Sequence, residues 1–245
     1  MYYNVLPGAP VQIAPHPDGF VNHQPLAVLS DFDGTIVPLN CVNLIFDRFG
    51  APECKEIAAR WDRGEISQKQ EYALGFATVH ATREEMEAVL DDVPMDPRFP
   101  PFVELCRQRG VPLAIVSDGL KWYIERILAR NGVHGVPIYA CDIRFLNPGY
   151  EFIFPYFEPS APLRGVSKRH IVQSYQAQGY SVAFIGDGNN DMDAAEVADI
   201  VFARASLLER AQRVGLSVIP FTNFGEIARA LFDFGIAPIA SAQLS

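Results

Sequence analysis

The sequence of 245 residues is poor in cysteine and tryptophan and has no long apolar run. Its four cysteines, Cys41, Cys54, Cys106 and Cys141, form no Cys-x-x-Cys pair and are typical of buried thiols in a cytoplasmic protein. No apolar stretch approaches the roughly 18 residues that a membrane-spanning helix requires. The first residues also lack the basic start and apolar core of a secretory signal. We therefore expect a cytoplasmic protein with no membrane partner.

Basic residues are also scarce: 20 Lys and Arg stand against 29 Asp and Glu, which gives a formal net charge of −9, and they form no block. Nucleic acid is therefore not an expected partner. An anionic small molecule is still compatible with this charge, because a bound cation and one or two placed basic groups can reverse the local field. The composition, 49% hydrophobic and 20% charged, indicates a globular chain that is long enough for a domain with an insertion. Homodimerisation is left open.

Three apolar runs end in an aspartate that a glycine follows closely. The first run, Leu26–Leu29, leads to Asp31, Asp33 and Gly34. Because the carboxyl ends of parallel strands meet at one edge of a sheet, we expect these acids to lie together. Crowded carboxylates repel one another unless a cation holds them, and Mg²⁺ prefers oxygen ligands. The pattern predicts a Mg²⁺ site, although Asp-x-Asp-Gly alone also suits a polar turn. The other two runs end in Ser117-Asp118-Gly119 and Gly186-Asp187-Gly188.

Strand and helix patterns alternate along the chain, which predicts an α/β fold with a doubly wound, Rossmann-like parallel sheet. Residues 38–97 show helical spacing with no strand pattern, so we expect a helical insertion there, a core of 1–37 and 98–245, and an N-terminal arm over 1–22. The expected strands are 26–29, 113–116, 137–141, 182–185, 200–202 and 218–219, with a hairpin of 143–146 and 150–154. The expected later helices are 101–109, 120–130, 167–177, 190–197, one from 206, and 226–234.

Four segments in this order resemble the motifs of the haloacid dehalogenase superfamily of phosphohydrolases: Asp31-Phe-Asp33-Gly-Thr35, Ser117, Lys168, and Gly186-Asp187-Gly-Asn-Asn190-Asp191. The likeness runs from about Leu26 to the end of the chain. The helical insertion is similar to the C1-type cap of the phosphoserine-phosphatase-like branch of that superfamily. The resemblance implies a Mg²⁺-dependent phosphomonoesterase that acts on a small phosphorylated metabolite.

The resemblance also implies roles for the catalytic residues. Asp31 would attack phosphorus and become an aspartyl phosphate, which splits a difficult hydrolysis into two steps. Asp33 would protonate the leaving alcohol and then deprotonate the attacking water. Lys168 would supply positive charge to the phosphoryl group, although a lysine near a helix start is ordinarily solvated. If Asp31 were only a metal ligand, water would be the nucleophile instead.

The same resemblance implies a ligand set for Mg²⁺: the carboxylates of Asp31 and Asp187 and the backbone carbonyl of Asp33. Asp191 would orient a metal-bound water or pair with Lys168. The alternative for 186–191 is a solvated turn that caps the next helix, and for Ser117 an ordinary turn residue. The residues expected to contact phosphate or substrate are Thr35, Ser117, Asp118, Gly119, Asn190 and Asn40.

The substrate prediction depends on two missing charges. Asn40 stands where the phosphoserine phosphatases have the Glu that binds the ammonium group, and the segment around Tyr72 has no Arg for the carboxylate. We therefore expect phosphoserine to be a poor substrate and a small keto or enol phosphate to be preferred. The tail, with Phe202-Ala-Arg204 and Phe224-Gly-Glu-Ile227, is similar to the methionine-salvage branch that dephosphorylates 2-hydroxy-3-keto-5-methylthiopentenyl-1-phosphate.

Other functions remain compatible with the sequence. One is a phosphotransferase, in which another hydroxyl replaces water; another is a phosphoserine phosphatase; and a third is a non-catalytic phosphate-binding protein. The aromatic residues of the insertion are expected to serve packing more than substrate binding, whereas 121–123 and the hairpin aromatics suit either role. The insertion aromatics are Phe46, Phe49, Trp61, Tyr72 and Phe76.

Overall fold

The computed structural model describes residues 24–233, and within them a seven-stranded sheet forms the centre of the molecule. Strand β1 (Leu26–Ser30) lies in the middle and pairs in parallel with β2 (Leu113–Leu120) and β5 (Ser181–Gly186). All five residues of β1 are buried, as expected for a strand with neighbours on both sides and helices on both faces. The predicted arm over 1–22 lies outside the described residues.

The order of the strands, β4-β3-β2-β1-β5-β6-β7, confirms the predicted doubly wound α/β fold. From β1 the chain builds outward in one direction and then returns to build in the other, so a change of direction falls at β1. All neighbouring strands are parallel except β4, which pairs antiparallel with β3. The remaining strands are β3 (Ile138–Phe145), β4 (Tyr150–Ile153), β6 (Ile200–Ala203) and β7 (Ile219–Pro220).

Two strands differ from their predicted bounds by more than one residue at an end. Strand β2 continues through Ser117, Asp118 and Gly119, because Leu120 still pairs with Cys141 of β3 beyond a register shift. The strand predicted at 137–141 and the first arm of the predicted hairpin are one continuous strand, β3. Its first half pairs with β2 and its second half with β4, so the backbone has a partner along its whole length.

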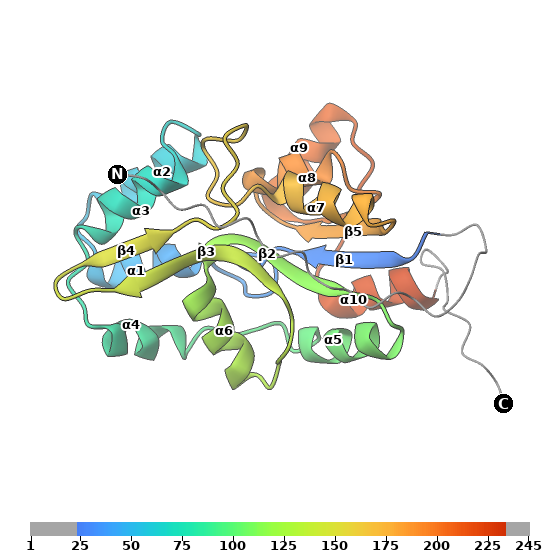
Figure 1. Cartoon of the computed structure of the whole chain (residues 1–245), viewed down its shortest axis with the longest axis horizontal. Coiled ribbons are helices and arrows are strands. Elements are labelled where there is room, and N and C mark those ends of the chain that lie inside the picture. The colour runs from blue at the N-terminus through green and yellow to red at the C-terminus, as the bar shows by residue number, and fades with distance from the viewer. Residues whose placement is uncertain (1–23, 234–245) are drawn as a thin grey trace.

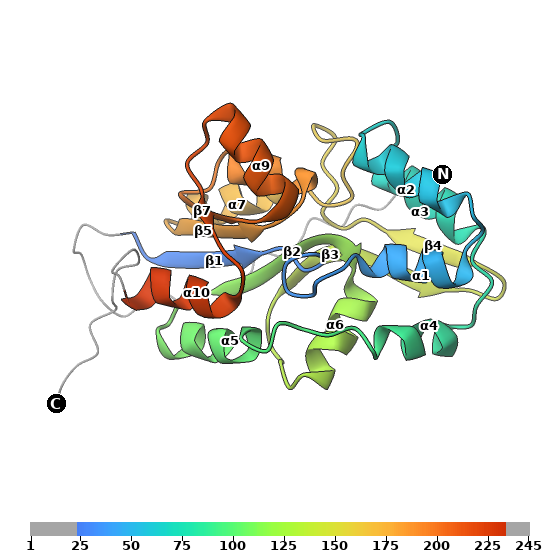
Figure 2. The ribbon, with the colours of Figure 1, turned by 180° about the vertical axis from the view of Figure 1, so that it is seen from behind.

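Helices cover both faces of the sheet (Figures 1 and 2), which gives three layers. The predicted helix 190–197 is instead a short 3₁₀ turn, Asn189–Asp191, followed by α8. The predicted helix 226–234 is α10 continued by a π-helical turn, Arg229–Asp233, and residue 234 lies outside the described part. One face carries α7 (Lys168–Ala177), α8 (Met192–Ala195) and α9 (Ala205–Val214), and the other carries α5 (Phe99–Gln108), α6 (Lys121–Arg130) and α10 (Phe224–Ala228).

Four helices follow β1 and lie beyond its carboxyl end (Figure 1): α1 (Cys41–Phe49), α2 (Cys54–Asp62), α3 (Gln68–Phe76) and α4 (Arg83–Leu90). Side chains cap three of them, because Asn40, Ser67 and Thr82 each accept a hydrogen bond from the first turn of the helix that follows. Thr82 and Glu85 form a capping box at the start of α4. Residues 38–97 are therefore helical, with no strand, as predicted. The division of the chain into a cap and a core stays a prediction.

Aromatic side chains join the insertion to the sheet. The ring centroid of Phe76 lies 5.2 Å from Phe46, 5.3 Å from Tyr150 and 4.9 Å from Phe152, so α3 packs on the β3–β4 hairpin. Phe46, Tyr72 and Phe76 belong to the same apolar cluster as β1, which supports the expected packing role of these three residues. The four cysteines are buried and free. Residues 24–233 contain no helix long and apolar enough to cross a membrane.

Candidate active site

Asp31 follows directly on β1 and is buried at the carboxyl edge of the sheet. Its backbone N–H still donates to Ile185 of β5, so the sheet pairing fixes its position. The side-chain Oδ1 accepts from the N–H of Phe32 at 2.7 Å, and Oδ2 lies 3.0 Å from the Lys168 ammonium. Burial raises the pKa of Asp31, and Lys168 opposes that shift. Both oxygens of the predicted nucleophile are therefore held by donors.

Lys168, the first residue of α7, is buried between two carboxylates. Its Nζ lies 2.6 Å from Asp191 Oδ1 and 3.0 Å from Asp31 Oδ2. Burial by itself would lower the pKa of Lys168, but the charges of Asp191 and Asp31 outweigh it and raise this pKa above its usual value. The side chain therefore carries a fixed positive charge at the nucleophile, and the pairing with Asp191 is one of the two roles expected for that residue.

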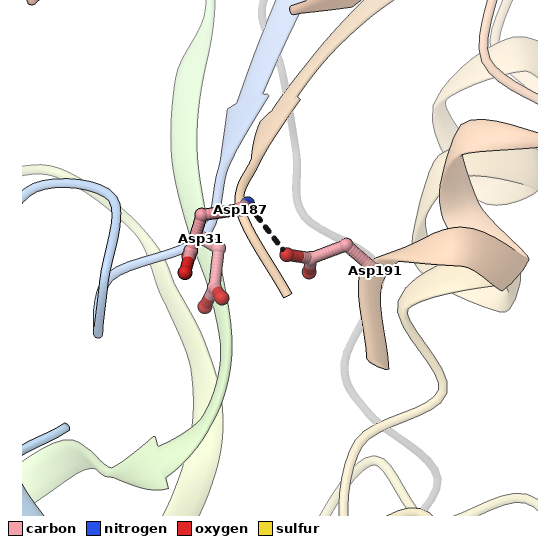
Figure 3. Close-up of side chains that lie close together, drawn as sticks. All are labelled: Asp31, Asp187 and Asp191. Atoms are coloured by element: carbon pink, nitrogen blue, oxygen red, sulfur yellow. Dashed lines mark hydrogen bonds between the residues drawn. The ribbon is translucent and has the colours of Figure 1, made fainter. Parts of the chain in front are cut away.

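Asp191 holds the turn that follows β5. Its Oδ2 accepts from the backbone N–H of Asp187 at 3.0 Å (Figure 3). The same oxygen accepts from the N–H of Gly188 at 2.9 Å, while Oδ1 contacts Lys168. A Cβ at Gly186 would lie 2.6 Å from Asp191 Oδ2, so only glycine leaves room for the carboxylate there. Both oxygens of Asp191 are thus engaged in orienting neighbouring groups.

Asp187 accepts a hydrogen bond from Thr35 Oγ1 at 2.8 Å. Burial, followed by the charge of Asp191, raises the pKa of Asp187 to about 6. Gly34 has a φ of +77°, and a Cβ there would lie 2.6 Å from Asp187 Cγ, so the turn after β1 can pass this carboxylate only as glycine. Thr35 differs from its expected role, because its hydroxyl is bonded to Asp187 and the residue does not line the cavity described below.

The three acids Asp31, Asp187 and Asp191 offer ligand oxygens that all lie within 4.8 Å of one another (Figure 3). Lys168 forms ion pairs with two of these carboxylates, and within residues 24–233 Asp187 forms none. One ammonium does not balance these three carboxylates, of which Asp31 and Asp191 are buried and Asp187 is half-buried, so the donor set fits a divalent cation with a preference for oxygen ligands.

Asp33 is held in a different way from Asp31. Its Oδ1 accepts from the N–H of Cys41 at 3.0 Å, and its Oδ2 accepts from the hydroxyl of Tyr123. Burial raises the pKa of Asp33, and the bond from Tyr123 opposes this. A Cβ at Gly119 would lie 2.7 Å from Asp33 Oδ2 and would overlap the Tyr123 hydroxyl, so the glycine makes the contact possible. The sequence pattern left Tyr123 open between packing and substrate binding, because nothing local marks its distant partner.

The end of β2 supplies a second group of polar residues. Ser117 Oγ accepts from the N–H of Gly119 at 3.1 Å. Asp118 accepts from the N–H of Val166 at 3.2 Å and from Asn190 Nδ2 at 2.9 Å, so this carboxylate orients Asn190. The hydroxyl of Tyr72 in α3 donates to the carbonyl of Asp118 at 2.6 Å, which ties the insertion to the strand end.

Arg204, just before α9, holds the turn after β1. Its Nε donates to the carbonyl of Gly34 at 2.9 Å, and its Nη2 donates to the carbonyls of Gly34 and Thr35. Sequence analysis placed Arg204 only in the tail that resembles the methionine-salvage branch. The partners are about 170 positions apart, so no local pattern could reveal this contact.

A cavity of about 490 Å³ opens between the strand ends and the insertion. Asn40, which also caps α1 by accepting from the N–H of Asn43 at 2.9 Å, contributes to its wall. Lys168 and Asp191 lie behind the wall and not on it. The predicted residues that line the cavity are Asp31, Asp33, Asn40, Ser117, Asp118, Gly119, Asp187 and Asn190, and the insertion adds Trp61, Asp62, Gln68, Glu71 and Tyr72.

Comparison with known proteins gives one family and several relatives. The model of the haloacid dehalogenase-like hydrolase family matches residues 28–196. The 2-hydroxy-3-keto-5-methylthiopentenyl-1-phosphate phosphatase of Brevibacillus brevis is 27% identical over 210 residues, which cover 84% of this chain and 95% of that protein. Pdp3-interacting factor 1 of Schizosaccharomyces pombe is 26% identical, over 84% of this chain and 94% of its own length.

Solved structures show the same fold. A phosphoserine phosphatase with an analogue of the phospho-aspartyl intermediate has a TM-score of 0.64 at 18% identity, covering 85% of this chain and 99% of its own. A hydrolase of the same superfamily from Salmonella enterica serovar Typhi has a TM-score of 0.68 at 18% identity, with coverage of 87% and 73%. At these identities the likeness concerns the fold.

Proposed function

Because the chain belongs to the haloacid dehalogenase-like hydrolase family, we propose that it is a phosphatase that hydrolyses small phosphate monoesters through an aspartyl phosphate on Asp31. The observation that carries this proposal is the buried series Asp31–Lys168–Asp191 at the carboxyl edge of the sheet, with Asp187 beside it. It places a carboxylate oxygen, a fixed ammonium and further oxygen ligands at one end of a cavity that admits a small molecule.

The first step of the proposed reaction is attack by a carboxylate oxygen of Asp31 on phosphorus. The bond from phosphorus to the ester oxygen breaks, and Asp33 gives its proton to that oxygen, so the alcohol leaves. Burial raises the pKa of Asp33, which favours the protonated form that this transfer requires. Lys168 supplies positive charge beside Asp31, and Ser117 offers a hydroxyl on the cavity wall.

The second step releases phosphate. Water attacks the phosphorus of the aspartyl phosphate, Asp33 takes a proton from that water, and the carboxylate of Asp31 is restored. Asp31 and Asp33 differ in their donors, since Asp31 contacts an ammonium and Asp33 contacts Tyr123 and a backbone N–H. Different surroundings of this kind allow two neighbouring carboxyl groups to act as nucleophile and as acid.

We also propose that the site binds Mg²⁺ through the carboxylates of Asp31 and Asp187 and the backbone carbonyl of Asp33. When bound, the ion would neutralise charge on the phosphoryl oxygens and orient the ester for in-line attack. Asp191 supports this set, because its oxygens are bonded to Lys168 and to the N–H groups of Asp187 and Gly188.

For the substrate we propose a small keto or enol phosphate with an uncharged leaving group, such as 2-hydroxy-3-keto-5-methylthiopentenyl-1-phosphate. The name of the Brevibacillus brevis relative supports this choice, and so does the neutral Asn40 in the cavity wall. Phosphoserine is the second candidate, because Arg164, which could pair with the serine carboxylate, and Glu71, which could pair with the ammonium group when ionised, also line the cavity. The ammonium and carboxylate groups of serine are attached to one carbon, so their partners in the site would have to lie close together. Within residues 24–233, Glu71 and Arg164 form no ion pair with each other.

The test uses p-nitrophenyl phosphate with Mg²⁺, with and without an acceptor alcohol. We expect release of inorganic phosphate in both mixtures. Transfer of the phosphoryl group to the alcohol as the main product would show a phosphotransferase instead, and no turnover with any ester would indicate a phosphate-binding protein. A comparison of kcat/KM for phosphoserine and a keto phosphate decides the substrate class, and equal values would overturn the argument from Asn40.

The proposal places the enzyme in the cytoplasm, which the four free, buried cysteines support. Its partner is a small phosphorylated metabolite.

A further inference from the structure

Three polar side chains of the insertion line the cavity, and two of them have a buried polar atom without a partner in the described part of the chain. Trp61 lies in the last turn of α2, and Gln68 and Glu71 lie in the first turn of α3. Within residues 24–233 the indole Nε1 of Trp61 and the amide Oε1 of Gln68 are buried and have no hydrogen-bond partner. Buried polar groups almost always have partners, so unpartnered atoms on a cavity wall indicate a ligand that supplies them.

The position of Gln68 is fixed from two sides. Its backbone N–H donates to the carbonyl of Leu163 at 3.0 Å, and its Cγ would lie 3.0 Å from a Cβ at Gly165. Its Nε2 donates to Glu71 Oε2 at 2.6 Å, and both side chains are only 3% exposed. The amide is therefore built into the wall, and its oxygen is a buried acceptor, without a partner among the described residues, in a residue that lines the cavity.

Glu71 adds a group that favours neutral ligands. Within the described residues no Lys or Arg nitrogen forms an ion pair with this carboxyl. Burial, followed by the charges of Asp62 and Asp118, raises the pKa of Glu71 well above its usual value. The neutral acid is favoured, so this group can donate as well as accept. A ligand carboxylate would meet the acidic side chains of Asp62, Glu71 and Asp118, and within 24–233 the cavity lining offers it one basic side chain, Arg164.

The unpartnered atoms define the ligand chemistry. Trp61 Nε1 can only donate, so it needs an oxygen acceptor, and Gln68 Oε1 can only accept, so it needs a hydroxyl or amine donor. A hydroxyl or a hydroxyketone satisfies both atoms. An alkyl group satisfies neither, and an ammonium group satisfies Gln68 but leaves the indole N–H unpaired.

We propose that Trp61, Gln68 and Glu71 form a leaving-group subsite that takes an uncharged group carrying hydroxyl or carbonyl oxygens. The subsite rests on the proposed phosphatase function, since it faces the leaving group of an ester whose phosphate lies at Asp31. A site built to bond a hydroxyl rejects the analogue that lacks it, because the buried atoms of the site are then left unpaired.

The experiment measures binding in the Asp31→Asn protein, in which the ester is not consumed. Dissociation constants are compared by calorimetry, with Mg²⁺ present, for dihydroxyacetone phosphate, n-propyl phosphate and phosphoethanolamine. We expect dihydroxyacetone phosphate to bind at least about tenfold more tightly than n-propyl phosphate. Adding Gln68→Met, which keeps the length of the side chain, or Trp61→Phe, which keeps the ring packing, should bring this ratio close to one.

The matched control is Gln173→Met in α7, because Gln173 is exposed and does not line the cavity. It should leave the ratio unchanged. The proposal is overturned if dihydroxyacetone phosphate and n-propyl phosphate bind equally, or if phosphoethanolamine binds more tightly than dihydroxyacetone phosphate. It is also overturned if both subsite variants keep the binding ratio within twofold of that of the Asp31→Asn protein. The readout is independent of hydrolysis. If the wild-type protein releases no phosphate from any ester, the proposed function fails, while the binding ratio still decides the subsite.

Discussion

At the scale of single residues, the carboxylates of the site are distinguished by what donates to them. Asp31 lies against the Lys168 ammonium, Asp33 accepts from Tyr123 and a backbone N–H, and Asp187 accepts from Thr35. Burial raises the pKa of both Asp31 and Asp33; the Lys168 ammonium opposes this shift at Asp31, and the Tyr123 hydroxyl opposes it at Asp33. Different donors to residues of one type are what the proposed roles of nucleophile, acid and metal ligand require.

Asp31→Asn should abolish turnover, because it removes the nucleophile and one negative charge from the metal site. The fold should persist, since asparagine has nearly the same shape and can still contact Lys168. Phosphate release and thermal melting check the two statements. In the native enzyme, beryllofluoride with Mg²⁺ should form its adduct on Asp31. A variant that keeps the wild-type rate would refute the covalent mechanism.

Asp187→Ala should raise the Mg²⁺ concentration needed for half-maximal activity by about tenfold or more, because a charged oxygen ligand is lost. In the native protein the apparent affinity for Mg²⁺ should fall as the pH drops below about 6. Under those conditions Asp187 holds a proton that the ion must displace. Titration of EDTA-treated protein at pH 5, 6 and 7.5 measures both effects. The control is Asp92→Ala, because Asp92 is exposed. If the Mg²⁺ titration of Asp187→Ala matches that of the native protein, Asp187 is excluded as a ligand.

Tyr123→Phe should shift the pH dependence of kcat/KM. Burial raises the pKa of Asp33, and the Tyr123 hydroxyl lowers it by bonding to the ionised form. Loss of that bond should raise the pKa further, so the basic limb of the profile should move to higher pH by roughly 0.5–1 unit. Identical profiles for the variant and the native enzyme would show that Tyr123 does not influence the acid.

At the scale of elements, the sequence predicted what local patterns determine. The apolar runs located β1, β2 and β5, and their order placed Asp31, Asp118 and Asp187 at one edge of the sheet. The continuation of β2 to Leu120 depends on a pairing with Cys141, which the pattern of β2 alone does not contain. The unbroken strand β3 likewise depends on having two different neighbours. Such features require the assembled sheet.

The turn after β1 is stabilised by a side chain from a distant part of the chain, Arg204. The substitution Arg204→Met should make this turn less ordered. The side chain bonds the carbonyls of Gly34 and Thr35, and Thr35 in turn bonds Asp187. Outer groups that orient metal ligands are commonly worth 10–100-fold in metal affinity, so we expect a rise of about tenfold in the Mg²⁺ requirement. Metal-dependent activity measures it. The matched Arg210→Met, on the exposed side of α9, should behave like the native enzyme; equal Mg²⁺ curves for both variants would disprove the role of Arg204.

At the scale of the whole molecule, the insertion and the sheet share one apolar cluster. Phe76→Ala removes a buried ring that contacts Phe46, Tyr150 and Phe152, so it should lower the free energy of unfolding by about 3–5 kcal/mol. Because the cluster is continuous, the loss should appear in a single unfolding transition. Denaturant titration by circular dichroism and tryptophan fluorescence measures both. Leu74→Ala, on the same helix at a side chain 45% exposed, should cost far less, and separate transitions would show that the insertion unfolds by itself.

The parts of the site that sequence analysis missed are those made by contacts across the molecule. Tyr123 meets Asp33 from 90 positions away, and Arg204 meets Gly34 from 170. Asp31 and Asp187 could be predicted because each follows a strand whose end is visible in the sequence, and Lys168 because it begins a helix at its place in the order of the motifs. The partners that orient them come from other helices, and their residue types serve equally well in ordinary packing.

The central place of β1 has a consequence for the synthesis of the chain. This strand leaves the ribosome first of the seven, but its neighbours begin only at Leu113 and Ser181. At about 5–20 residues per second, the segment Leu26–Ser30 waits roughly 4–17 s for its first partner and roughly 8–31 s for its second. During that interval a five-residue apolar strand has both edges free, and the later strand β5 also brings Asp187. During this period the unpaired edges of β1 are exposed to aggregation and to binding by chaperones. The carboxylates of Asp31, Asp187 and Asp191 come together only after it ends.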